Sequence, residues 1–120
     1  MESDVRRAIE LALSTLSERE RQSAAAYIDT RELDSRARMT IGRVETEIPA
    51  RGYLVFVDPS PTANWGHPCR YLLIETATGT IHRFDAQFPP FLRDVSPTLR
   101  LIWKGQQVPV AVLPVTEGVE

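Results

Sequence analysis

The residues best suited to chemistry lie in one short stretch, 58–70, which holds the only cysteine, one of two histidines and one of two tryptophans. Cys69 and His67 are two residues apart, and a histidine beside a thiol is the arrangement of a cysteine nucleophile with its base. If Gly79 closes a three-residue hairpin loop, Asp85 becomes a diagonal neighbour of Cys69 on the partner strand. Cys69, His67 and Asp85 could then form the centre of a thiol-dependent hydrolase.

Three features of the stretch argue against this chemistry. Cys69 enters a strand, where no helix N-terminus lowers the pKa of its thiol. The rigid ring of Pro68 restricts how the His67 imidazole can turn back. The same hairpin register places His82 about 16 Å along the partner strand and on the opposite face. Since a free cysteine most often behaves as a small buried hydrophobic residue, we expect Cys69 to be buried and the protein to be non-catalytic.

A metal site is disfavoured by the spacing of its candidate ligands, which matches no common zinc pattern: His67, Cys69, His82 and Asp85. A glycine-rich loop that opens a helix, as phosphate sites require, is absent from the sequence. We therefore expect neither a metal nor another cofactor. His82 is expected to be a half-buried strand residue on the face of Leu72, Ile74 and Phe84.

The remaining role for residues 58–70 is to bind another molecule. The three prolines and one glycine of this stretch disfavour helix and strand, and they predict a shaped loop between two strands. Trp65 supplies a large apolar surface with one N–H donor, and Arg70 supplies a planar fork for carboxylates. Tryptophan and arginine are enriched among the residues that dominate protein interfaces. The predicted binding residues are Asn64, Trp65, His67, Cys69 and Arg70.

Three of these side chains also have an internal role that competes with recognition. Trp65 could plug the loop against the sheet while Asp58 and Asn64 bond to loop backbone. Arg70 could form an intramolecular ion pair with Asp58 or with Asp85. These alternatives stay open on the sequence alone.

Composition narrows the class of partner. The 120 residues are 42% hydrophobic and 25% charged, which is typical of a single soluble domain. The net charge of −2 and the scattered arginines argue against nucleic acid as the partner.

No apolar run approaches the roughly 20 residues that a membrane span needs, and charged residues from Asp4 onward interrupt any leader-like segment. One cysteine cannot form an internal disulfide, so a cytoplasmic setting is expected.

The N-terminal part has the periodicity of a helix. Apolar residues recur at helical spacing at Val5, Ala8, Ile9, Ala12, Leu13 and Leu16. Ser17 and Glu20 have the spacing of a capping box, which predicts a second helix that continues through Ala24, Tyr27 and Ile28 and ends near residues 34–35. A single helix from Asp4 to about Asp29 is the competing prediction.

From residue 43 the apolar period changes to two, as in strands. In residues 43–48 polar and apolar side chains alternate, which predicts a strand with one solvent-exposed face and with Val44, Thr46 and Ile48 pointing inward. Residues 53–57 are apolar on both sides, which predicts a central strand. The turn 77–79 joins a hairpin of residues 70–76 and 80–84. Residues 99–103 and 108–112 predict a last pair, with the second at an edge because of Pro109 and Pro114. The segment 85–98 is expected to be irregular, with Phe88 and Phe91 against the core.

Together these elements predict an α+β fold, in which an N-terminal helix or helical hairpin packs on a mostly antiparallel sheet of four to six strands. A single domain is expected over 1–120, with a helical part at 1–38, a sheet part at 39–115 and a loose tail at 116–120. The predicted function is a non-catalytic, cytoplasmic regulator, inhibitor or adaptor that binds another protein through residues 58–70. The alternatives are the thiol-dependent hydrolase and a small-molecule sensor with a closed pocket under the loop.

Overall fold

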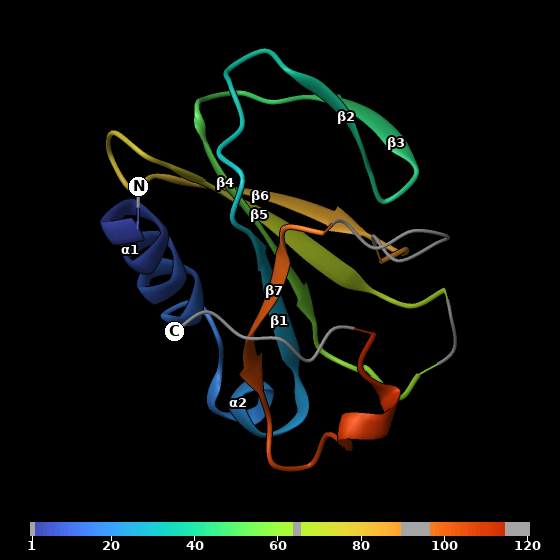
Figure 1. Cartoon of the computed structure of the whole chain (residues 1–120). Helices are drawn as coiled ribbons and strands as arrows, with labels where there is room; N and C mark the ends of the chain where they lie inside the picture. Colours follow the sequence, from blue (N-terminus) through green and yellow to red (C-terminus); the bar gives the residue numbers. More distant parts are fainter. Residues whose placement is uncertain (1, 64–65, 90–96, 115–120) are drawn as a thin grey trace.

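The computed structural model describes residues 2–63, 66–89 and 97–114, arranged as one main helix and a short one on a five-stranded sheet (Figure 1). The helices are α1 (Glu2–Leu13) and α2 (Glu18–Ser23), and a short 3₁₀ helix covers Val110–Val112. The strands are β1 (Ala25–Asp29), β2 (Arg38–Ile41), β3 (Val44–Glu47), β4 (Gly52–Asp58), β5 (Cys69–Glu75), β6 (Ile81–Ala86) and β7 (Leu99–Lys104). The predicted α+β fold is confirmed.

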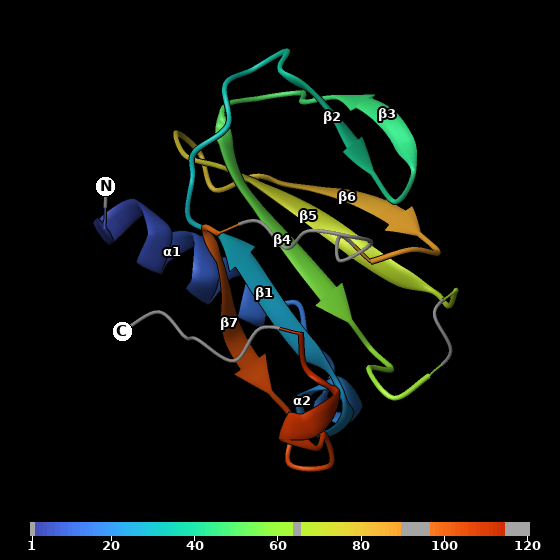
Figure 2. The same cartoon turned by 45° about the vertical axis from the view of Figure 1, so that its right-hand side comes forward.

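The main sheet has the strand order β6-β5-β4-β1-β7, and every neighbouring pair is antiparallel. On one face α1 packs Val5, Ala8 and Ala12 against Val55 and the residues around it. On the other face the β2–β3 hairpin contributes Ile41 to a second cluster around Phe56 (Figure 2). Both faces of the central strands are therefore covered. Among the described residues, neither helix has the length and apolarity that crossing a bilayer demands.

The first helix is confirmed, although it already begins at Glu2, and the start of the second helix is confirmed as well, but the second helix is much shorter than expected. Ser17 caps α2: its side chain accepts from the Glu20 N–H, and the Glu20 carboxylate accepts from the Ser17 N–H. The helix then ends at Ser23.

The prediction that the helix continues past residue 24 is wrong, and so is the single helix to Asp29. Ala25–Asp29 is β1, a strand buried along its whole length between β4 and β7. The expected helical part at 1–38 therefore contains a central strand. Alanine favours helix locally, but pairing on both edges and burial on both faces outweigh that preference of a few tenths of a kcal/mol per residue.

The central strand predicted at 53–57 is confirmed as β4, in which every residue is buried. The strand predicted at 99–103 is confirmed as β7. The strand predicted at 108–112 is wrong, because Val110–Val112 forms a 3₁₀ turn after Pro109. Pro109 has no N–H to donate, and the Val108 N–H bonds back to the Gly105 carbonyl instead of to a neighbouring strand.

The wet-faced strand predicted at 43–48 is present as β3, but it lies outside the main sheet and pairs with β2, which was not predicted. Of its three residues expected to point inward, only Ile48 is buried, and Val44 is 64% exposed. A tight turn joins the two strands, with Gly42 and Arg43 both at positive φ.

The β5–β6 hairpin is confirmed, but its register differs by one residue from the predicted one. Gly79 has the expected positive φ of 76°. Ile74 pairs with Ile81 rather than with His82, because Thr76 belongs to the loop. The Thr76 N–H donates to the Arg51 carbonyl and its hydroxyl donates to Glu32, which draws this residue away from β6. A shift of one residue moves each partner side chain to the other face of the sheet.

Part of the segment expected to be irregular extends the sheet, since β6 continues through Asp85 to Ala86. Phe88 is half-buried, and its carbonyl accepts a hydrogen bond from the Tyr71 hydroxyl at 2.9 Å. Phe91 and the tail at 116–120 lie outside the described residues.

Candidate functional site

The loop that follows β4 is held at its base by Asp58. This carboxylate is buried at the end of β4, and its Oδ1 accepts from the Ser60 N–H at 2.9 Å. The same oxygen lies 2.7 Å from His67 Nε2. The alternative in which Asp58 bonds to loop backbone is therefore present, while its counterpart at Asn64 lies outside the described residues. The Ala63 N–H donates to the Ser60 carbonyl, and the His67 N–H donates to the Gln87 carbonyl. Both ends of the loop are therefore fixed to the sheet.

Cys69 is buried, as predicted, among the apolar residues on the face of Tyr71. Burial, with a smaller contribution from the negative charge of Asp58, raises the pKa of its thiol to about 11. At neutral pH the thiol is therefore protonated, which is the unreactive form.

The group of Cys69, His67 and Asp85, which the sequence offered as the alternative centre of a hydrolase, is not assembled. Asp85 pairs with Arg70 in the sheet, so its side chain points to the face opposite to Cys69. The His67 ring is bonded to Asp58. The one-residue register shift explains the error, because the expected register had made Asp85 a neighbour of Cys69.

His82 is half-buried, as predicted, but the side chains expected on its face are only partly correct. It pairs with Leu73 and so shares a face with Tyr71 and Cys69, not with Leu72 and Ile74. Its Nε2 lies 2.6 Å from Glu75. Within the described ranges, no three His, Cys, Asp or Glu side chains are grouped so that they could hold a metal ion.

Arg70 forms an internal ion pair with a partner that the sequence did not indicate. Its Nη1 and Nη2 donate to the two oxygens of Glu20 at 2.6 and 3.0 Å, and the residue is only 9% exposed. The hydrogen bond from Arg70 is the largest cause that holds the pKa of Glu20 below its ordinary value. Neither Asp58 nor Asp85 takes this role, because α2 brings Glu20 within reach. Arg70 thus joins β5 to α2.

Asn64 and Trp65, the other predicted binding residues, lie outside the described residues. Their roles in binding stay predictions.

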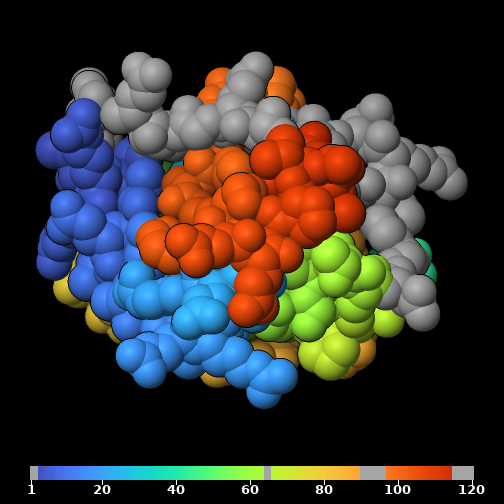
Figure 3. All heavy atoms as spheres, turned by 90° about the horizontal axis from the view of Figure 1, so that it is seen from below, coloured from blue at the N-terminus to red at the C-terminus, as the bar shows by residue number. Residues whose placement is uncertain are grey.

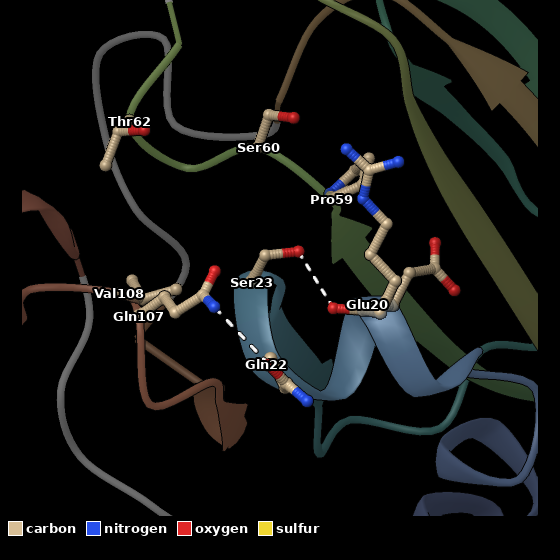
Figure 4. Close-up of a pocket in the computed structure, with 9 residues that line it drawn as sticks. Glu20, Gln22, Ser23, Pro59, Ser60, Thr62, Gln107 and Val108 are labelled. Atoms are coloured by element: carbon tan, nitrogen blue, oxygen red, sulfur yellow. Dashed lines mark hydrogen bonds between the residues drawn. The ribbon is translucent and has the colours of Figure 1, made fainter.

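A polar groove of about 590 Å³ runs between the loop and α2, and we call it the α2 groove (Figure 4). Seen from below, the segments that form it meet on one face of the molecule (Figure 3). Its lining comes from three segments: helix α2 contributes Arg19, Glu20, Gln22 and Ser23, the loop contributes Pro59, Ser60 and Thr62, and the turn after β7 contributes Gln107 and Val108.

The turn after β7 is fixed against α2 by backbone contacts. The Gly105 N–H donates to the Ala24 carbonyl and the Gln107 N–H to the Gln22 carbonyl, both at 2.9 Å. A Cβ at Gly105 would lie 2.2 Å from the Gln22 oxygen, so only glycine permits this approach. The wall of the groove that carries Gln107 is therefore firmly positioned.

Arg19 is a charged side chain of the groove that sequence reasoning missed. It is exposed, and its guanidinium has no hydrogen-bond or ion-pair partner within the part of the chain that the structure describes. Glu20, next to it, is already bound by Arg70. The capping box was the signal that could have revealed Arg19, because it places this residue in the first turn of a short surface helix.

A second, smaller hollow of about 270 Å³ lies on the other side of the same loop, and we call it the apolar hollow. Pro61, Ala63, Pro89, Val112 and Pro114 form most of its lining, and the remaining lining residues are Asp58, His67 and Tyr27. It is open on one side, unlike the closed pocket that a sensor would need. Residues 58–63 therefore form a ridge between a polar groove and an apolar hollow.

Comparison with protein-family models, with curated proteins and with solved structures finds no match for this chain.

Proposed function

We propose that the protein is a non-catalytic binding module, and that it recognises a segment of another protein across the ridge formed by residues 58–63. The observation that carries this proposal is the ridge itself, a braced loop that separates two hollows of different chemistry. A loop that is shaped before binding avoids the ordering cost of about 1 kcal/mol or more per residue. A cytoplasmic regulator, inhibitor or adaptor would act in this way.

The two hollows support a particular chemistry for the proposed partner. The apolar hollow accepts an apolar side chain against Pro61, Ala63 and Val112. The α2 groove offers the unengaged guanidinium of Arg19, which favours a carboxylate. We therefore propose that the bound segment carries an apolar residue followed by an acidic residue on the far side of the ridge. Trp65, in the same loop, is proposed to add contact area.

The test is selection of binders from a random peptide library with the folded protein as bait. We expect the selected peptides to be enriched in an apolar residue near an Asp or Glu. Arg19→Ala should weaken their binding about tenfold or more, since a hydrogen bond to a charged group is worth about 1.5–3 kcal/mol. The matched control is Arg38→Ala, which removes an exposed arginine of β2 that does not line the groove. Equal binding by the Arg19→Ala variant would refute this use of the groove.

The apolar hollow can be tested with two valines of one 3₁₀ turn. Val112 lines the hollow, whereas Val110 is more exposed, at 59% against 40%, and does not line it. Val112→Asp should abolish binding of the selected peptides, and Val110→Asp should leave it unchanged. Trp65→Ala should weaken binding by at least about 2 kcal/mol if this residue is a hot spot. Thermal melts of all variants separate lost binding from lost folding.

A further inference from the structure

Strand β6 is an edge of the main sheet, and the side of its backbone that faces away from β5 is unpaired within the described residues. The Glu75 N–H donates to the Thr80 carbonyl, which makes these two a hydrogen-bonded pair. Hydrogen-bonded pairs alternate along an antiparallel ladder, so His82, Phe84 and Ala86 direct their backbone groups to β5. The N–H and C=O groups of Ile81, Arg83 and Asp85 therefore point outward.

The exposed side chains of this edge carry one charge of each sign, two residues apart. Arg83 and Asp85 lie on the same face, with Nε 2.7 Å from Oδ1, and their side chains are 62% and 73% exposed. Charged residues usually protect a sheet edge from pairing. Here the opposite signs make the edge complementary to an antiparallel copy of itself.

We propose that β6 is a self-association edge, on which a second copy of this chain adds its own β6 in antiparallel orientation with the two-fold axis at Phe84. In this register Arg83 lies opposite Asp85 of the second copy, and the reverse pair is equivalent by symmetry. Their outward backbone groups then form reciprocal hydrogen bonds. The four side chains form a square in which each charge has neighbours of opposite sign, and such cross-strand pairs stabilise a sheet.

The alternative registers are disfavoured by the same two residues. A shift by two residues in one direction places Arg83 opposite Arg83, and a shift in the other direction places Asp85 opposite Asp85. Like charges directly opposite one another destabilise a strand pair. A shift by one residue would pair opposite faces of the two strands.

Two further features support pairing of β6 with its own copy about Phe84, one on the other face of β6 and one at the opposite edge of the sheet. At the two-fold axis the half-buried Phe84 meets its own copy in a non-hydrogen-bonded pair, where side chains approach closely. Strand β7, at the other edge, carries Arg100 and Lys104 and no acidic residue, so it would repel a copy of itself.

Since an edge contact of one short strand buries less area than a standard interface of about 1,600 Å², we expect a weak dimer in rapid exchange.

The test is sedimentation equilibrium of the whole chain over a range of concentrations up to about 1 mM, where weak interfaces are populated. Arg83→Asp and Asp85→Arg each place like charges across the two-fold axis, and each should raise the dimer dissociation constant at least tenfold. The double variant that exchanges the two residues should restore dimerisation. Arg38→Asp and Glu45→Arg, at the exposed pair of the β2–β3 hairpin, are the controls and should have no effect.

Hydrogen exchange identifies the edge directly. The amides of Arg83 and Asp85 should become protected as the protein concentration rises, whereas those of His82 and Phe84 should be protected at every concentration. A protein that stays monomeric up to about 1 mM, or a dimer that the single variants leave unchanged, would overturn the proposal. Protection of Arg83 and Asp85 only when an unrelated strand is added would also overturn it, because the occupant would then be another protein.

Discussion

At the scale of single residues, the candidate site depends on buried polar side chains that each have a specific partner. Asp58 binds the Ser60 N–H and the His67 ring, and Glu20 binds Arg70. Sequence reasoning had raised a bond from Asp58 to the loop and an internal ion pair of Arg70 as alternatives to recognition, and both are present. It could not indicate Glu20, because that contact spans 50 residues and depends on where α2 lies.

Cys69 should be unreactive in the folded protein. Its thiol is buried and its pKa is raised to about 11, so very little thiolate is present near neutral pH. We expect slow labelling by a thiol reagent in the native state and fast labelling after unfolding, followed by absorbance at pH 7 to 8. Rapid stoichiometric labelling of the folded protein would contradict this expectation and favour the thiol-dependent hydrolase.

Loss of Arg70 should destabilise the fold. Arg70→Met keeps most of the apolar stem but leaves Glu20 without its charged partner, which should lower the free energy of unfolding by about 2–3 kcal/mol. Arg38→Met, at an exposed pair, should change it by less than about 1 kcal/mol. Urea unfolding of both variants measures the difference. A wild-type midpoint for Arg70→Met would show that the Glu20 contact contributes little.

The effect of Arg70 should depend on pH in a defined direction. Arg70 holds the pKa of Glu20 in the folded protein below its ordinary value of 4.5. The stability from this pair is therefore fully present above pH 4.5 and is lost as the pH falls through the folded pKa. Urea unfolding at several pH values should show the difference between the wild type and Arg70→Met shrinking below pH 4.5. A constant difference down to pH 3 would argue against this linkage.

At the scale of elements, the sequence predicted those elements whose local pattern and tertiary surroundings agree. The helix α1, the buried strand β4 and the β5–β6 hairpin are of this kind. The prediction for residues 25–29 was wrong because alanine favours helix locally, whereas in the fold this segment is a buried strand. The hairpin register was wrong because Glu32 and Arg51, distant in sequence, hold Thr76 in the loop. The α2 groove needs three separate segments, and no local pattern describes it.

Gly79 should be required by the hairpin because of its positive φ of 76°. Gly79→Val should lower the free energy of unfolding by roughly 1–2 kcal/mol through left-handed strain. A Cβ there would lie 3.0 Å from the ends of the Arg7 and Leu11 side chains, which are flexible, so the backbone carries most of the cost. Gly79→Asn, which tolerates this conformation better, is the control and should lose less. Thermal denaturation of the two variants compares them, and equal losses would contradict the strain argument.

At the scale of the whole molecule, a sheet covered on both faces carries a hairpin that is much less buried. Every residue of β4 is buried, whereas only Ile41 is buried in β2 and β3. The hairpin strands pair only with each other. Local opening should therefore be much easier in the hairpin than in the sheet.

Amide hydrogen exchange should reveal this difference. We expect the amides of β4 to exchange slowest, and those of β2 and β3 to exchange about 100-fold faster or more, because they open without disturbing the main sheet. Two-dimensional NMR after transfer to heavy water measures both sets in one sample. Equal protection of β3 and β4 would mean that the hairpin opens only with the whole fold.

The position of β1 between β4 and β7 also bears on how the protein is made. A ribosome completes β1 early. Thr30, directly after β1, is hydrogen-bonded to Thr98, directly before β7, and the two lie 68 residues apart in the sequence. At about 5–20 residues per second, that interval lasts roughly 3–14 s. Throughout it, one edge of a wholly apolar run, Ala25 to Ile28, lacks its native neighbour. A ribosome that stalls before β7 would thus hold a nascent chain in which the apolar strand β1 has an unpaired edge, and such an edge is prone to aggregate.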